Sequence, residues 1–125
     1  MYLQSRPDDV GAITNLGIAL VSTGKDEDAL VAFRRAVDVD PANGSSRRNL
    51  ANALFDHGDI AEAAAQSLEV VKLRPDDPAA SDLLGRVLAA QGQFDEAEVH
   101  FRRSLQLDPN YQDAREHLDA MRRRH

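Results

Sequence analysis

A repeat of 34 residues runs along this chain and limits what it can fold into more than any other feature. Four kinds of residue recur at that spacing without an insertion. They are proline (Pro7, Pro41, Pro75, Pro109), glycine (Gly24, Gly58, Gly92), leucine (Leu16, Leu50, Leu84, Leu118) and alanine (Ala29, Ala63, Ala97). A fixed period of about 20–50 residues is typical of arrays of stacked units. The sequence therefore predicts a tandem array of one small structural unit.

Each unit is predicted to be two helices joined by a tight turn. Residues 11–23 carry an apolar stripe at helical spacing, and Gly24 follows where a helix favours a left-handed residue at its end. A second helix is expected from Asp26 to Val39, with Pro41 beyond it because proline cannot continue a helix. The residues expected to be buried are Leu16, Ala19, Leu20, Ala29, Leu30, Phe33, Ala36 and Val37.

Polar residues at the helix starts are interpreted as caps. The paired acids Asp8-Asp9 and Asp76-Asp77 fall where a side-chain oxygen can accept from free backbone N–H groups. Asp59 and Glu62 have the spacing of a capping box at the start of a second helix. We therefore interpret these carboxylates as structural rather than as catalytic pairs.

The predicted fold class is all-α, a solenoid of antiparallel helix pairs ending in a capping helix. One pair cannot cover its own apolar stripe, so the core becomes continuous only when pairs stack. The predicted divisions are 1–9 as the end of a preceding unit, 10–43, 44–77 and 78–111 as three full units, and 112–125 as a polar capping helix.

Composition excludes several classes of function. The 125 residues include no Cys, which removes disulfides and thiolate chemistry, and the four His residues have no metal-binding spacing. A net charge of −6 argues against nucleic-acid binding, and no apolar run is long enough to span a membrane. We expect a non-catalytic cytoplasmic protein with no cofactor and no metal.

The conserved spacing carries a specific motif. The first unit has Leu16-Gly17, Ala29, Phe33, Ala36 and Pro41, and the third has Leu84-Gly85, Ala97, Phe101 and Pro109. This pattern resembles the tetratricopeptide repeat, and the resemblance implies a right-handed superhelix with a concave groove. The middle unit departs from the pattern with Ala51 and Ser67, so we expect it to be the least tightly packed, with Phe55 as a compensating residue.

The resemblance also implies which residues line the groove. Carried onto this chain, they are Thr14, Asn15, Ile18 and Ser22 in the first unit, Arg48, Asn49, Asn52 and Phe55 in the second, and Asp82 and Arg86 in the third. Asn15 and Asn49 occupy the same position of the 34-residue repeat, which we call a column. The next two members of this column are not asparagine but Leu83 and His117. An amide can both donate to and accept from a peptide backbone. The positions do not match those with which some family members bind the carboxylate at a chaperone's C-terminus.

The predicted function is a scaffold for protein–protein interaction that binds a peptide or partner segment in the groove. Two alternatives stay open. The asparagine column is also compatible with the substrate-recruiting part of a larger transferase, similar to the O-linked N-acetylglucosamine transferase. The exposed first edge of the array is compatible with weak self-association.

Overall fold

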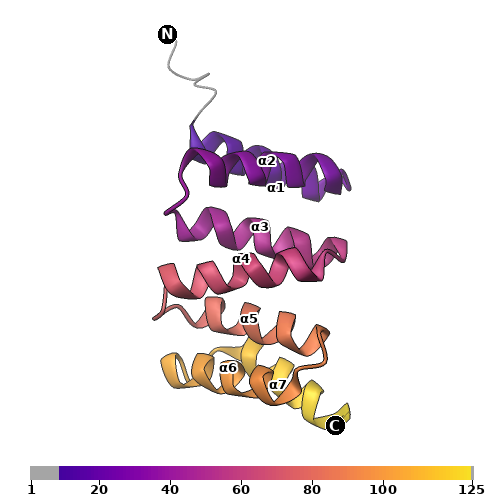
Figure 1. Ribbon diagram of the computed structural model, residues 1–125, viewed down its shortest axis with the longest axis vertical. Coiled ribbons are helices and arrows are strands. Elements are labelled where there is room, and N and C mark those ends of the chain that lie inside the picture. The colour runs from indigo at the N-terminus through magenta and orange to yellow at the C-terminus, as the bar shows by residue number, and fades with distance from the viewer. Residues whose placement is uncertain (1–8, 125) are drawn as a thin grey trace.

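In the computed structural model, which describes residues 9–124, the chain forms seven helices and no strand over that range. The helices are α1 (Val10–Ser22), α2 (Asp26–Val39), α3 (Gly44–His57), α4 (Ile60–Leu73), α5 (Pro78–Ala90), α6 (Phe94–Leu107) and α7 (Gln112–Arg124). Figure 1 shows them stacked in chain order along the longest axis. The prediction of an all-α array is confirmed. The expected end of a preceding unit, apart from Asp9, lies outside the described residues, as does the capping residue Asp8.

The two helices of each full pair are joined by a turn that contains a left-handed glycine. Gly24, Gly58 and Gly92 have φ angles of 78°, 92° and 81°, a conformation that other residues rarely adopt. In each turn the backbone N–H that follows the glycine bonds to a carbonyl in the preceding helix, as Asp59 N does to Leu54 O at 2.8 Å. The predicted helix ends at these glycines are confirmed.

Side-chain oxygens cap the first helix of each full pair. Asp9 accepts from Ala12 N in α1, and Asn43 accepts from Ser46 N in α3. The expected capping box of Asp59 and Glu62 is wrong, because the Asp59 side chain makes no capping bond to α4. Glu62 instead accepts from Arg34 on α2, and this hydrogen bond lowers the pKa of Glu62 below its usual value.

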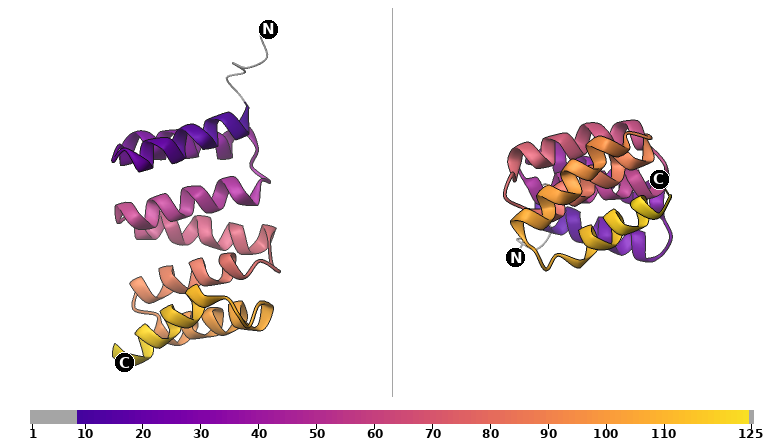
Figure 2. Two further views of the ribbon diagram at one scale, coloured as in Figure 1. Left: turned by 180° about the vertical axis from the view of Figure 1, so that it is seen from behind. Right: turned by 90° about the horizontal axis from the view of Figure 1, so that it is seen from below.

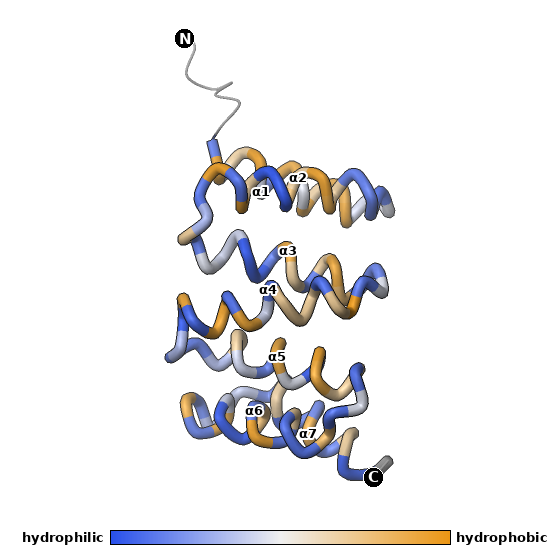
Figure 3. Tube along the Cα trace, in the orientation of Figure 1, coloured by the Kyte–Doolittle hydropathy of each residue, from blue (hydrophilic) through white to orange (hydrophobic). Residues whose placement is uncertain are grey.

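Apolar positions alternate with polar ones along the helices, as Figure 3 shows. Apolar side chains of α2, α3, α4 and α5 meet in one buried cluster. All the residues expected to be buried on the second helix of the first unit are buried. Leu50, Leu84 and Leu118 are also buried.

Leu16, in the same column, is 55% exposed, and Ala19 is exposed as well, so the prediction of a buried stripe on α1 is wrong there. The corresponding face of α3 packs on α2 and that of α5 packs on α4. In the described part of the chain, no helix precedes α1 to cover its face.

The first helices of successive pairs lie closer together than the second helices. Within residues 9–124, α1 contacts α3, α3 contacts α5 and α5 contacts α7, whereas α2, α4 and α6 make no such contacts with one another. A stack whose helices approach more closely on one side must curve toward that side. The concave side is therefore formed by α1, α3, α5 and α7. The left view of Figure 2 shows the same stack from behind.

Candidate partner-binding groove

Two adjoining cavities lie on the concave side between α3, α5 and α7, and the second also reaches α6. The first, which we call the polar chamber, measures about 530 Å³. It is lined by Arg48, Asn49, Asn52, Ala79, Asp82, Arg86, Tyr111, Asp113 and His117. The second, the apolar chamber, measures about 430 Å³. It is lined by Phe55, Arg86, Ala89, Ala90, Phe94, Phe101, His117, Ala120 and Met121. Arg86 and His117 line both chambers and therefore form their common border.

A buried carboxylate holds the two border side chains. Asp82 is only 3% exposed, and its Oδ1 lies 2.8 Å from His117 Nδ1, which donates to it. Its Oδ2 lies 3.5 Å from Arg86 Nε, close enough for an ion pair. Burying a carboxylate is costly unless cations or hydrogen-bond donors compensate it. Asp82 therefore positions Arg86 and His117 rather than presenting itself to a partner.

Arg86 links α5 to α3 through two further contacts. Its Nη2 donates to Asn52 Oδ1 at 2.9 Å, and its guanidinium carbon lies 5.3 Å from the centre of the Phe55 ring. A guanidinium at that distance from an aromatic face is attracted by the ring. Arg86 Nε is a buried polar atom without a hydrogen bond in the described residues, although it stands beside Asp82. Asn52, Phe55 and Asp82 therefore hold the guanidinium at the border of the two chambers.

His117 closes the border from the α7 side. Its ring centre lies 5.9 Å from that of Phe101, with the two planes tilted by 32°. Tyr111, just before α7, lines the polar chamber. The pKa of its hydroxyl is raised, mainly by burial and also by the nearby carboxylates of Asp82 and Asp113. The Tyr111 hydroxyl is thus neutral at physiological pH and can donate a hydrogen bond.

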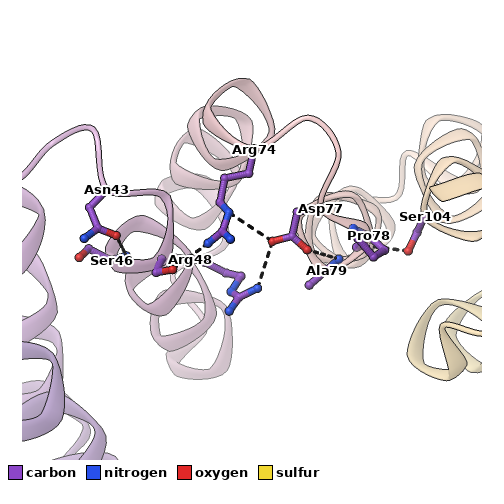
Figure 4. Close-up of polar contacts among 9 residues, drawn as sticks. Asn43, Ser46, Arg48, Arg74, Asp77, Pro78, Ala79 and Ser104 are labelled. Atoms are coloured by element: carbon purple, nitrogen blue, oxygen red, sulfur yellow. Dashed lines mark hydrogen bonds and ion pairs between the residues drawn. The ribbon is translucent and has the colours of Figure 1, made fainter. Parts of the chain in front are cut away.

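Arg48 connects the polar chamber to the start of α5. Its Nη1 donates to Asp77 Oδ2 at 3.2 Å, and the other oxygen of the same carboxylate accepts from Ala79 N at 2.9 Å (Figure 4). Arg74 also lies beside Asp77, with 3.6 Å between its Nε and Oδ2. The cation of Arg48 is therefore already paired within the chain.

The structure brings together the predicted site residues of the second and third units. Arg48, Asn49, Asn52, Asp82 and Arg86 line the polar chamber, and Phe55 lines the apolar one. The predicted residues of the first unit line neither chamber: they are Thr14, Asn15, Ile18 and Ser22 on α1. The asparagine column stops at Leu83, which is 1% exposed and belongs to the core.

Sequence reasoning missed the contribution of the last helix. The chambers are lined by Asp113, His117, Ala120 and Met121 of α7 and by Tyr111 just before it. Residues 112–125 are predicted from the sequence only to cap the array. One signal was available, because His117 stands in the same 34-residue column as Asn15 and Asn49. That column places α7 in the same register of the repeat as α1 and α3.

The described residues offer little for other kinds of site. Within residues 9–124 no three His, Asp or Glu side chains come together as ligands for a metal ion. No helix in that range combines the length and the apolar character that crossing a membrane requires.

Comparison with known proteins identifies the repeat. A family model described as "Tetratricopeptide repeat" matches residues 14–78 and 48–112. DnaJ homolog subfamily C member 3 from Mus musculus is 34% identical over 108 residues, which are 86% of this chain and 21% of that relative. Cell division cycle protein 27 homolog A from Arabidopsis thaliana is 30% identical over 98 residues, 78% of this chain and 14% of the relative. The chain thus spans about a fifth or less of the length of these relatives.

Solved structures show the same fold. The first such repeat domain of Spaghetti (RPAP3), bound to the HSP90 peptide SRMEEVD, has a TM-score of 0.87 at 23% identity, covering 97% of this chain and 96% of that one. YrrB, described as having an unusual peptide-binding site, has a TM-score of 0.81 at 21% identity, covering 86% of this chain and 56% of that one. Because the family model matches most of the sequence and these structures share its architecture, the chain belongs to the tetratricopeptide-repeat family.

Proposed function

We propose that this chain is a non-catalytic scaffold that binds an extended segment of a partner protein on its concave side. The observation that carries the proposal is the pair of adjoining chambers, which are lined mainly by side chains from α3, α5, α6 and α7. Proteins of this family act as interaction scaffolds, and two structurally similar members are described as binding peptides. We also propose 10–43, 44–77 and 78–111 as the three full units, with α7 contributing to binding as well as covering the core.

The polar chamber has groups suited to a peptide main chain. The Asn49 side chain makes no hydrogen bond to another described residue, so its amide can both donate and accept. Asn52 accepts from Arg86 through Oδ1, which leaves its N–H groups available as donors. The N–H and C=O groups of an extended segment need such partners when they leave water. Binding of this kind forms and breaks no covalent bond.

A displayed library of random peptides tests the proposal. Peptides selected on the wild-type chain are synthesised, and their affinities are measured by fluorescence anisotropy for wild type, Asn49→Ala and Gln106→Ala. We expect Asn49→Ala to weaken binding about three- to tenfold, the effect of one hydrogen bond. Gln106 is exposed on α6, away from both chambers, so Gln106→Ala serves as the matched control.

Far-ultraviolet circular dichroism establishes that both variants keep the helical fold. The proposal is wrong if no peptide is enriched over the bare support. It is also wrong if the selected peptides bind wild type and Asn49→Ala equally.

A further inference from the structure

We propose that the groove recognises an uncharged extended stretch with one large apolar side chain, and that this side chain enters the apolar chamber while its main chain lies in the polar chamber. This inference rests on the proposed function and names the chemistry of the partner. Two alternatives are an acidic segment and a terminal carboxylate, and the charges in the groove disfavour both.

The apolar chamber has the lining of a side-chain pocket and ample room for one large side chain. Phe55, Phe94 and Met121 provide large apolar walls from three different helices, and Ala89, Ala90 and Ala120 leave the space between them open. Its volume of about 430 Å³ falls within the range of about 300–1,000 Å³ found for ligand sites. Water in such a lining gains few hydrogen bonds, so an apolar side chain that replaces it is favoured. The chamber therefore selects an apolar anchor.

The position of the border explains how one residue can use both chambers. Arg86 and His117 line each of them, and the buried carboxylate of Asp82 contacts both side chains. A side chain that passes this border into the apolar chamber carries its own backbone to the Asn49 and Asn52 side of the groove. The amide groups there suit peptide N–H and C=O groups of any sequence. Specificity then comes from the anchor, and the main chain adds affinity.

The charges in the polar chamber argue against an acidic ligand. Arg48 is paired with Asp77 at 3.2 Å, and Arg86 stands 3.5 Å from Asp82. Asp113 adds another carboxylate to the lining. An acidic group would have to displace one of these carboxylates from its arginine and would face repulsion from the rest. The peptide SRMEEVD, with three acidic residues, is therefore an informative contrast probe.

The test uses peptides selected from the displayed library and a chain whose apolar chamber has been narrowed by a larger side chain. Ala120→Leu places a larger side chain in the chamber from α7, and Ala65→Leu on the exposed face of α4 is the matched control. Each selected peptide is also made with its apolar residue replaced by alanine. We expect this replacement to weaken binding to wild type about tenfold or more.

Ala120→Leu should weaken the binding of the original peptide by a similar factor, while the Ala65→Leu variant should bind it as tightly as wild type does. The alanine-replaced peptide should bind wild type and Ala120→Leu equally, because neither complex then has an anchor in the chamber. SRMEEVD should bind more weakly than the selected peptides. If Ala120→Leu unfolds the chain, Ala89→Leu narrows the same chamber from α5.

The inference is overturned if selection enriches acidic residues or a free carboxyl terminus, or if narrowing the chamber leaves affinity unchanged. In those cases the proposed function survives as long as Asn49→Ala still weakens binding. If selection yields no binding peptide at all, the proposed function fails and the inference fails with it.

Discussion

At the scale of single residues, the first and third units each rely on a glycine that faces a phenylalanine. A Cβ added at Gly17 would lie 2.5 Å from Phe33, and one added at Gly85 would lie 2.7 Å from Phe101. The middle unit has Ala51 and Ser67 at the corresponding positions, and both are completely buried. The buried Ser67 hydroxyl donates a hydrogen bond to Ala63 O at 2.7 Å. The small and large residues thus change together, so the lost phenylalanine is accompanied by an added methyl group.

This pairing predicts that the effect of a methyl group at position 85 changes sign with its neighbour. Gly85→Ala alone should lower the free energy of unfolding by about 1–2 kcal/mol, because the methyl group meets the Phe101 ring and overpacks the core. Phe101→Ser should cost about 3–5 kcal/mol through the cavity that it leaves. In that background Gly85→Ala should stabilise the chain by up to about 1 kcal/mol through helix propensity. Urea denaturation of the wild type, both single variants and the double variant measures the coupling, and an equal cost of Gly85→Ala in both backgrounds would contradict the pairing.

At the scale of helices, one carboxylate organises the junction of α3, α4 and α5. Asp77 caps α5 through Ala79 N, accepts from Arg48 on α3, and stands beside Arg74 at the end of α4. The neighbouring Ser104 on α6 donates to the carbonyl of Pro78 at 2.7 Å (Figure 4). Each contact is modest alone, but together they set the angle at which α5 leaves the turn. Because α5 carries Asp82 and Arg86, this junction also positions the border of the groove.

The two adjacent aspartates at this junction should differ sharply in their importance. Asp77→Ala should lower the free energy of unfolding by about 2 kcal/mol, since it removes a helix cap worth about 1 kcal/mol and a partly buried ion-pair partner. Asp76 is exposed, so Asp76→Ala should stay within about 0.5 kcal/mol of wild type. Thermal and urea unfolding measure the stability of the two variants, which remove the same carboxylate from neighbouring positions. Equal losses would mean that net charge, rather than the cap, accounts for the effect.

At the scale of the whole molecule, the period of the sequence predicts most of the fold. The second helix of the first unit was expected from Asp26 to Val39, and α2 has those bounds, because glycine and proline end helices through local geometry alone. The residues that line the groove could not be predicted in the same way. Repeat columns indicate which helix faces meet, but the burial of Asp82 and Leu83 depends on how α7 and α3 pack against α5. The error at Leu16 has the same origin, since a column does not state whether a neighbouring helix covers it.

The contrast between Leu16 and Leu50 gives a direct measure of what stacking contributes. Both occupy the same column of the repeat, but Leu16 is 55% exposed on α1 whereas Leu50 is 2% exposed beneath α2. In an array, each unit is stabilised by its own contacts and by those with its nearest neighbours. Leu50→Ala should therefore cost about 2–5 kcal/mol, the range for a leucine truncated inside a packed core. Leu16→Ala should cost less than about 1 kcal/mol, because most of its surface is already in water. Urea unfolding followed by circular dichroism compares the two variants. A cost at Leu16 as large as that at Leu50 would mean that the face of α1 is covered in solution, and a concentration dependence of that cost would identify a second copy of the chain as what covers it.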